Sequence, residues 1–252
     1  MKVTVLGCGT SSGVPRIDGT WGTADPNNPK NRRRRVSIWV QDGDTSLVVD
    51  TSPDLREQCL SNNIKRIDAV LYTHDHADHT HGIDDLRGFR HTQGKLIDVY
   101  GLPETLAVLK RRFDYIFVEK LGYPPICQPH EITGRDPFQL GGIRVQPFHQ
   151  VHGPITSVGY RFGKLAYSTD VSDLPEEAFR ALEGVDTWIV DALRYQPHPT
   201  HPHLEKTLGW IERVKPRRAI LTHMTGDMDY DTLCRDLPKG VEPAYDGLTF
   251  EL

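Results

Sequence analysis

Cysteine is scarce in this 252-residue chain, and its few thiols are scattered. None of them forms a C-x-x-C pair, so neither a disulfide framework nor a cysteine zinc site is indicated. Isolated cysteines of this kind commonly serve as small buried side chains. We therefore predict buried thiols at Cys8, Cys59, Cys127 and Cys234.

Long apolar runs and a strong excess of one charge are also missing. No stretch approaches the ~20 residues of a membrane span. The opening MKVTVLGCGTSSG is typical of a strand that enters a glycine loop, not of a signal peptide. The formal net charge of −4 provides no general attraction to nucleic acid or to anionic membranes. These features predict a cytoplasmic protein with no membrane partner.

Residues 1–252 are predicted to form a single α/β domain, because α/β folds of this length are commonly one unit. Strand-like segments lie at residues 2–7, 37–41, 46–50, 68–73, 98–101, 143–148, 158–162, 164–170, 187–192 and 218–224. Helical periodicity appears at Asp54–Ser61, Pro103–Phe113, Pro175–Leu182 and Glu205–Val214. Runs of strands with helices between them favour two sheets with helices outside. The long irregular segment Gly19–Arg35 is expected to be a functional or covering loop.

The densest cluster of titratable side chains is LYTHDHADHTHGIDD, residues 71–85, which holds four of the twelve histidines. It follows an apolar strand-like segment, and sites in layered α/β domains lie at strand ends. His74 and His76 are two positions apart, with Asp78 and His79 directly behind them. A tight loop can turn such side chains toward one point, whereas a regular helix would separate His74 from His76. Imidazole and carboxylate are usual ligands of a hydrolytic metal, so we predict a metal site here.

Histidines and aspartates also occur where other predicted strands end. His149 and His152 follow one strand, while Asp170, Asp191 and His223 end three later ones. Any one of these residues taken alone could be a turn or capping residue. A whole series of them after HDHADH instead predicts a dinuclear metal centre.

The chain resembles the metallo-β-lactamase fold hydrolases, whose signature H-x-H-x-D-H is met by His74, His76, Asp78 and His79. The segments GCGTSSGVPR, VVDTSPDLREQ, STD, HPTH, LTHM and AYDGL follow in the family's order, so the resemblance spans nearly the whole chain. It is strongest to the phosphodiesterase branch that includes the phosphonate-pathway cyclic phosphodiesterase and is related to the tRNA 3′-processing nucleases. This resemblance implies an αββα sandwich, two mixed β-sheets flanked by helices, with metals at one edge.

The resemblance also implies a role for most of the clustered side chains. One metal ion would be bound by His74, His76 and His152, and the other by Asp78, His79 and His223. Asp170 would bridge the two ions, and Asp50 of VVDTS would support the metal loop from behind. His149 is a weaker alternative to His152. His81 and His91 have no counterpart among the family's ligands.

Two departures from the relatives affect the segment after GVPR. Many members of the branch carry several cysteines there that bind a structural zinc, and IDGTWGTADPNNPK has none. Another kind of contact is therefore expected to order this loop. Nothing resembles the long arm with which the tRNA-processing nucleases grip RNA. The run Arg32–Arg35 could attract RNA, but a partly paired, phosphate-facing or solvated face is its commoner meaning.

The expected cofactors are two divalent transition-metal ions, manganese or zinc, with iron also compatible. They would provide a bridging hydroxide as the nucleophile and would clamp the oxygens of a phosphodiester. His201 of HPTH falls where the family's general acid lies, with His198 and His203 as weaker candidates, and Asp78 is counted as catalytic as well as a ligand.

The leading prediction is thus a metal-dependent phosphodiesterase acting on a small cyclic or nucleotide-like phosphodiester. The alternatives are another hydrolase of the same fold, namely an RNA 3′-processing nuclease, a thioesterase or a lactonase, and a binding module without catalysis. RNA is a weaker candidate partner than a small phosphodiester, and a homodimer is left open.

Overall fold

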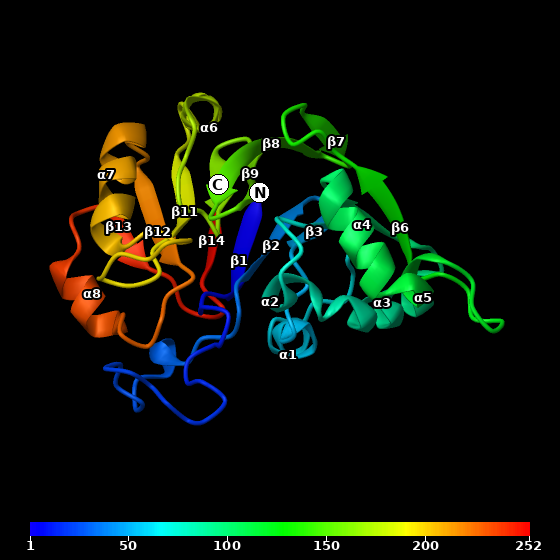
Figure 1. Ribbon diagram of the computed structural model, residues 1–252, viewed down its shortest axis with the longest axis horizontal. Coiled ribbons are helices and arrows are strands. Elements are labelled where there is room, and N and C mark those ends of the chain that lie inside the picture. Colours follow the sequence, from blue (N-terminus) through cyan, green and yellow to red (C-terminus); the bar gives the residue numbers. More distant parts are fainter.

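The computed structural model describes residues 1–252, which form two seven-stranded mixed sheets with helices on the outside (Figure 1). In spatial order, the first sheet contains β14 (Thr249–Glu251), β1 (Lys2–Gly7), β2 (Ser37–Asp42), β3 (Thr45–Val49), β4 (Ala69–Leu71), β5 (Ile97–Gly101) and β6 (Cys127–Glu131). Strands β3 to β6 are parallel to one another, and β14, β1, β2 and β3 pair antiparallel.

The second sheet has the same number of strands and a similar mixture of directions. In spatial order it contains β13 (Val241–Pro243), β12 (Arg218–Thr222), β11 (Thr187–Asp191), β10 (Leu165–Ser168), β9 (Ile155–Phe162), β8 (Ile143–His152) and β7 (Phe138–Leu140). Strands β10 to β13 are parallel, and β7 to β10 pair antiparallel. The αββα sandwich predicted from the sequence is confirmed.

The helices are short, and most lie in the connections between strands (Figure 1). They are α1 (Leu55–Ser61), α2 (Ala77–Thr80), α3 (Leu86–Gln93), α4 (Pro103–Arg112), α5 (Asp114–Phe117), α6 (Glu176–Leu182), α7 (Leu204–Val214) and α8 (Tyr230–Asp236), with 3₁₀ turns η1 (Pro29–Asn31) and η2 (Ile83–Asp85). The four predicted helices correspond to α1, α4, α6 and α7. None of the helices is both long and apolar enough to cross a membrane.

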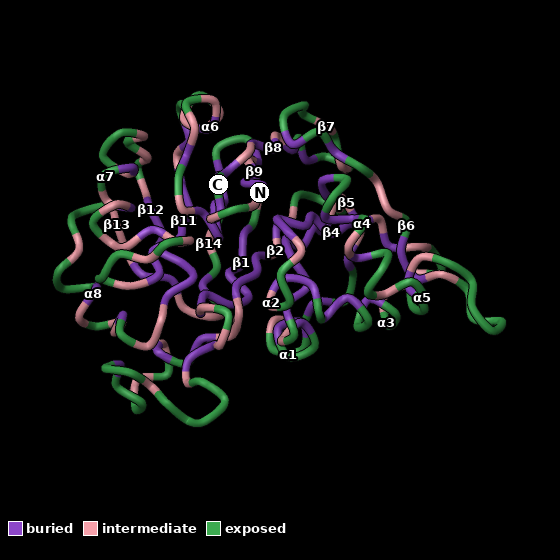
Figure 2. The backbone as a smooth tube through the Cα atoms, viewed as in Figure 1, coloured by how far each residue is buried: buried purple, intermediate pink, exposed green.

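Two hydrophobic clusters hold these layers together, and β3 shows how one strand serves both. Leu47 and Val49 belong to the larger cluster of 37 buried residues, which includes side chains of both sheets. Val48, between them, belongs to a second cluster of 17 residues together with Leu106 of α4. Side chains of a strand alternate between its faces, so the first sheet is buried on both sides. Figure 2 shows this burial along the central strands.

The cysteine prediction is confirmed at three positions and wrong at the fourth. Cys8, Cys59 and Cys127 are buried, but Cys234 is exposed on α8. The reason is that α8 packs mainly through Leu233, which is buried, while the neighbouring position faces outward.

The irregular segment Gly19–Arg35 is held in place by polar contacts. The side chain of Arg33 is buried and donates hydrogen bonds to the carbonyl oxygens of Thr225 at 3.0 Å and Met228 at 2.5 Å. Asn31 Nδ2 donates to Asp229 Oδ2 at 2.7 Å. These contacts fasten the loop to the segment between β12 and α8, and they provide the ordering that the missing cysteines left to be explained.

Candidate metal centre

The predicted site residues lie where several strands end at one edge of the sandwich. Asp50 follows β3, Asp170 follows β10, Asp191 ends β11 and His223 follows β12. Asp50, Asp170 and His223 have positive φ angles of 64°, 51° and 58°. Residues other than glycine rarely adopt this left-handed conformation, and such strain is concentrated at functional sites. Three strands therefore end in strained turns at this edge.

The HDHADH segment provides the next side chains. It begins two residues after Tyr72, just beyond β4, and its second half forms the single turn α2 with Asp78 and His79. His152 comes from the second sheet, as the last residue of β8. The sequence placed His149 and His152 after a strand ending at residue 148, but β8 continues through both because it pairs with β9 from Val145 to His152.

Two groups of side chains could each hold a metal ion, and both include Asp170. Within each group, the potential ligand atoms all lie within 4.8 Å of one another. The first group consists of His74, His76, His152 and Asp170. The second group consists of Asp78, His79, Asp170 and His223. This division matches the two ligand sets that the family resemblance implies.

The two carboxylate oxygens of Asp170 face different groups. Its Oδ2 lies 3.8 Å from Nε2 of His74 and 3.6 Å from Nε2 of His152. Its Oδ1 lies 3.0 Å from Nε2 of His79 and 3.4 Å from Nε2 of His223. A carboxylate placed in this way can share one oxygen with each of two cations.

Three of the histidine rings are oriented by contacts on their outer sides. His79 Nδ1 lies 2.7 Å from Asp50 Oδ2, His152 Nδ1 lies 2.8 Å from the Thr200 carbonyl oxygen, and His74 Nδ1 lies 3.0 Å from Thr73 Oγ1. The inner Nε2 atoms of His74, His79 and His223 are buried without any hydrogen-bond partner. Buried polar atoms without a partner are costly, so these nitrogen atoms fit metal ions.

Burial and neighbouring carboxylates pull the histidine pKa values in opposite directions. Burial lowers the pKa of His74 well below its usual value and also lowers that of His152. Burial acts in the same direction on His79 and His223, but nearby carboxylates outweigh it: the pKa of His79 is raised well above its usual value and that of His223 to about 9. The site thus concentrates negative charge that a bound cation would neutralise, displacing protons as it binds.

Asp50 lies behind the metal loop, where the family resemblance places it. It is fully buried, and its Oδ1 accepts a hydrogen bond from the backbone N–H of Thr73 at 2.8 Å. Its Oδ2 accepts from the Thr73 hydroxyl at 2.8 Å and faces His79 Nδ1. Burial raises the pKa of Asp50, although His79 and Thr73 oppose that shift. One carboxylate therefore connects the strand end to both halves of the loop.

His201 lies beside the same centre and is held by Asp191. His201 Nδ1 lies 2.8 Å from Asp191 Oδ2, and its Nε2 lies 3.8 Å from Asp170 Oδ2. Asp191 Oδ2 also accepts a hydrogen bond from the backbone N–H of Asp170 at 3.1 Å. The ring of His201 stacks on that of His223, with centroids 4.6 Å apart. Asp191, His201, His223 and Asp170 form a third cluster of potential ligand atoms.

The other histidines weighed from the sequence lie outside these groups. His149 Nε2 faces the Thr133 carbonyl oxygen at 3.1 Å, and His81 packs edge-on against Phe113. His198 contacts Thr200, and His203 Nε2 lies 4.0 Å from the exposed Glu205. His198, His203 and His91 belong to none of the groups that could hold a metal.

Three residues around the site were missed or left without a role by sequence reasoning. Thr73 ties Asp50 to the loop, and its position directly before HDH was a signal that could have been used. Asp191 was recognised as a strand end but not as the partner of His201. Arg112, at the end of α4, contacts the carbonyl and carboxylate of Asp75 from 37 residues away, and nothing local in the sequence indicates that contact.

A family model described as beta-lactamase superfamily domain matches residues 45–224, which include every residue of the three clusters. The chain belongs to the metallo-β-lactamase superfamily. The membership predicted from H-x-H-x-D-H is thereby confirmed. Its buried histidine and aspartate clusters could hold metal ions.

Curated relatives of this metallo-β-lactamase superfamily member carry different names. An octanoyltransferase of Porphyromonas gingivalis (strain ATCC BAA-308 / W83) is 31% identical over 98% of this chain and 51% of its own length. A ribonuclease Z of Bradyrhizobium sp. (strain ORS 278) is 28% identical over 53% of this chain and 46% of its own length. The chain thus spans about half the length of the curated relatives that it matches.

Solved structures match over the whole chain. A diphosphatase from the PhnP family is 38% identical, with a TM-score of 0.90, covering 100% of this chain and 97% of the other. Zinc-bound PqqB from Methylobacterium extorquens is 22% identical, with a TM-score of 0.80 and full coverage of both chains. The second likeness is one of fold.

Proposed function

We propose that this chain is a metal-dependent phosphodiesterase that hydrolyses a small cyclic or nucleotide-like phosphodiester at two divalent metal ions. The observation that carries the proposal is that the two carboxylate oxygens of Asp170 face two different histidine groups. His201 Nε2 lies 3.8 Å from one of these oxygens, Oδ2. Two cations and an acid would then meet at one point.

Seven residues would hold the two ions. His74, His76 and His152 would bind one, Asp78, His79 and His223 the other, and Asp170 both. This donor set contains no thiolate, so manganese or zinc is expected and iron is also compatible. When bound, the ions would supply an activated water and positive charge beside the phosphoryl oxygens.

His201 would act as the general acid. Asp191 accepts a hydrogen bond from Nδ1–H of His201, which leaves Nε2 directed toward the Asp170 carboxylate. In the protonated ring, Nε2–H would pass its proton to the oxygen that leaves as its bond to phosphorus breaks, giving a neutral alcohol. Such a step suits a basic alkoxide leaving group such as a ribose oxygen.

A diphosphate linkage is a second candidate for the bond cleaved. The solved structure that is 38% identical over nearly its full length is described as a diphosphatase. A phosphorus atom in such a linkage is also flanked by two bridging oxygens, so the same metal arrangement would serve. The leaving group would be a phosphate, which needs a proton much less than an alkoxide does.

Turnover by purified protein loaded with manganese or zinc tests these proposals. The substrates are bis(p-nitrophenyl) phosphate, a 2′,3′-cyclic nucleotide, a dinucleoside diphosphate, a p-nitrophenyl carboxylic ester and a lactone. We expect cleavage of the phosphodiesters that chelation abolishes and added metal restores. Preference for the dinucleoside diphosphate would favour the second candidate. Cleavage of the ester or lactone alone would contradict both.

A further inference from the structure

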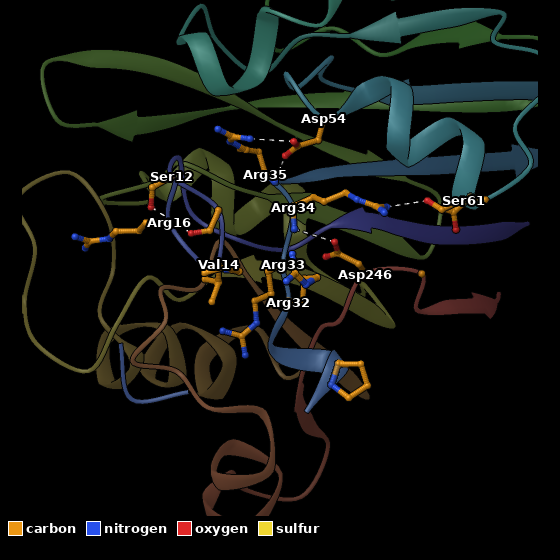
Figure 3. A pocket seen from close by; sticks show the side chains of 15 residues that line it. Ser12, Val14, Arg16, Arg32, Arg33, Arg34, Arg35, Asp54, Ser61 and Asp246 are labelled. Atoms are coloured by element: carbon orange, nitrogen blue, oxygen red, sulfur yellow. Dashed lines mark hydrogen bonds and ion pairs between the residues drawn. The ribbon is translucent and has the colours of Figure 1, made fainter. Parts of the chain in front are cut away.

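A polar pocket of about 590 Å³ is lined by none of the residues of the candidate metal centre. Figure 3 shows its lining side chains. Its walls come from the loop after β1, the run that precedes β2, the region of α1 and the turn before β14. Only one of its lining residues is hydrophobic, and five are arginines. The arginines are Arg16, Arg32, Arg33, Arg34 and Arg35.

The positive charge of this pocket is only partly compensated. Arg35 forms an ion pair with Asp54 at 2.9 Å. Arg34 instead donates to the Ser61 hydroxyl at 2.7 Å, while its backbone N–H donates to Asp246 at 2.8 Å (Figure 3). No carboxylate lies within 4.0 Å of the guanidinium groups of Arg16, Arg32, Arg33 and Arg34, so the pocket carries excess positive charge.

Arg33 makes the strongest case for an anionic ligand. Its side chain is 2% exposed, its guanidinium contacts only carbonyl and amide oxygens, and its Nε has no hydrogen-bond partner. Burial lowers the pKa of Arg33, although Cys8, Asp246 and Asp229 oppose that shift from beyond ion-pair distance. A buried charge without a counter-charge is costly, and an anion in the adjoining pocket would reduce that cost.

The surroundings of the pocket favour a compact ligand over a long polyanion. Beyond Pro29, which lines the pocket, Asn28 and Asn31 contact Asp231 and Asp229, and Asp25 lies in the same segment. An RNA strand continuing past the pocket on this side would meet these carboxylates instead of further arginines. On this side, therefore, the positive charge ends at the pocket.

From these observations we propose that the arginine pocket binds the phosphate group of a small molecule, at a site separate from the metal centre. Two sources share this chemistry. One is a phosphate that the substrate carries away from its scissile bond, and this version rests on the proposed function. The other is a free phosphate compound that acts as an effector. Either could influence the metal centre, because Arg33 contacts Thr225, two residues after His223.

Binding is tested first, with inorganic phosphate as the probe and the metal-loaded protein. The guanidinium of Arg32 lies 5.4 Å from the ring centroid of Trp21, so the fluorescence of Trp21 should report occupancy, with Trp21→Phe as the blank. Removing one charged donor should weaken phosphate binding about tenfold or more. We expect this loss in Arg32→Gln and Arg34→Gln. The control is Arg87→Gln, an exposed arginine paired with Asp84, which should bind phosphate as the wild type does.

Several outcomes would overturn the proposal. Equal phosphate affinity in the wild type and both pocket variants would remove the pocket as the site. Tight binding of an oligoribonucleotide without terminal phosphates, strongly salt-dependent and lost in the same variants, would assign the pocket to nucleic acid if phosphate itself does not bind. Circular dichroism and metal content verify the fold of Arg34→Gln. Arg32 is exposed, so Arg32→Gln remains a test if the other variant unfolds.

Kinetics distinguish the two sources of the phosphate. For a remote substrate phosphate, Arg34→Gln should raise KM about tenfold for the p-nitrophenyl ester of thymidine 5′-phosphate that also carries a 3′-phosphate. The kcat, and all constants for bis(p-nitrophenyl) phosphate, should be unchanged. For an effector, added phosphate should change the rate of bis(p-nitrophenyl) phosphate turnover in the wild type, and this change should be smaller in Arg34→Gln. If neither of these two responses is observed, the link between the pocket and catalysis is refuted. Absence of all turnover would refute the proposed function while leaving the binding result intact.

Discussion

Asp50 Oδ2 lies 2.7 Å from His79 Nδ1, and both side chains are fully buried. The same carboxylate also accepts the backbone N–H and the hydroxyl of Thr73. Asp50 belongs to none of the potential ligand groups, yet it fixes the direction in which His79 presents Nε2. Its influence on metal binding should be large, because contacts of this kind determine the orientation and basicity of a ligand.

Replacement of Asp50 by asparagine should weaken metal binding ~10- to 100-fold. In the wild type, Thr73 and His79 share the Asp50 carboxylate as acceptor. In Asp50→Asn, the side-chain NH₂ group would replace one carboxylate oxygen and would face these donors. Competition with a chromophoric chelator would measure the affinity. Asp84→Asn, which changes an exposed carboxylate on η2, is the control and should keep its metal. Unchanged affinity in Asp50→Asn would show that the loop holds itself in place.

Asp170→Ala should lose metal and activity together, because both ligand groups include this residue. In the wild type we expect close to two transition-metal ions per chain by elemental analysis. The variant should retain fewer than one under the same dialysis. A single tightly bound ion in fully active wild-type protein would contradict the dinuclear arrangement.

His201→Ala should separate leaving groups by their need for a proton. The rate on a 2′,3′-cyclic nucleotide should fall ~10²- to 10⁴-fold, with a much smaller loss on bis(p-nitrophenyl) phosphate. Asp191→Asn should lower both rates as His201→Ala does, because it removes the negative charge beside His201 Nδ1. His198→Ala is the matched control from the same loop.

Equal losses on both substrates with metal retained would instead mean that His201 binds the phosphoryl group. His203 would then become the next candidate acid. Loss of metal from His201→Ala would make His201 a ligand, in keeping with the third cluster that it forms with Asp170, Asp191 and His223.

Cysteine substitutions should change stability without changing metal content. Replacing any of the buried thiols of Cys8, Cys59 and Cys127 by alanine should lower the free energy of unfolding by ~1 to 3 kcal/mol. Burial raises the pKa of Cys59 to about 12, so it should resist alkylation in the folded protein. Mass spectrometry after iodoacetamide treatment should find the label on the exposed Cys234. Loss of a metal ion in a cysteine variant would indicate a thiolate site.

Asp246 should make stability depend on pH. Burial raises its pKa from 3.8 to about 7, so between these values the folded protein retains a proton that the unfolded chain has lost. Its contribution to stability is therefore complete below about pH 4 and is lost as the pH rises through 7. Asp246→Asn cannot titrate. Chemical denaturation should thus show the wild type's advantage over the variant shrinking between pH 4 and 7.

Sequence reasoning brought together the histidines and aspartates that the structure clusters, because two independent signals agreed. HDHADH places four side chains in one loop, and the strands before Asp170 and His223 are short, largely apolar segments that are easy to recognise. Since parallel strands end at a common edge, recognising the strands was enough to bring distant ligands together.

Several of the missed elements are very short, and two of them are strands that depend on distant partners. β14 has three residues and exists because it pairs with β1, almost the whole chain away, and β7 is an equally short edge strand beside β8. α2 is a single turn within the metal loop. Segments this short carry too few residues to show a period, so their structure cannot be recognised locally.

Arg33 was equally hidden, because in RRRR nothing distinguishes the one arginine that turns inward. Its guanidinium keeps its charge at every physiological pH, and the carbonyl groups that receive its hydrogen bonds are neither oxidised nor removed by chelators. A loop fastened in this way does not depend on metal supply or redox state. The protein without metal ions should therefore still present the same arginine pocket to a ligand as the metal-loaded protein does.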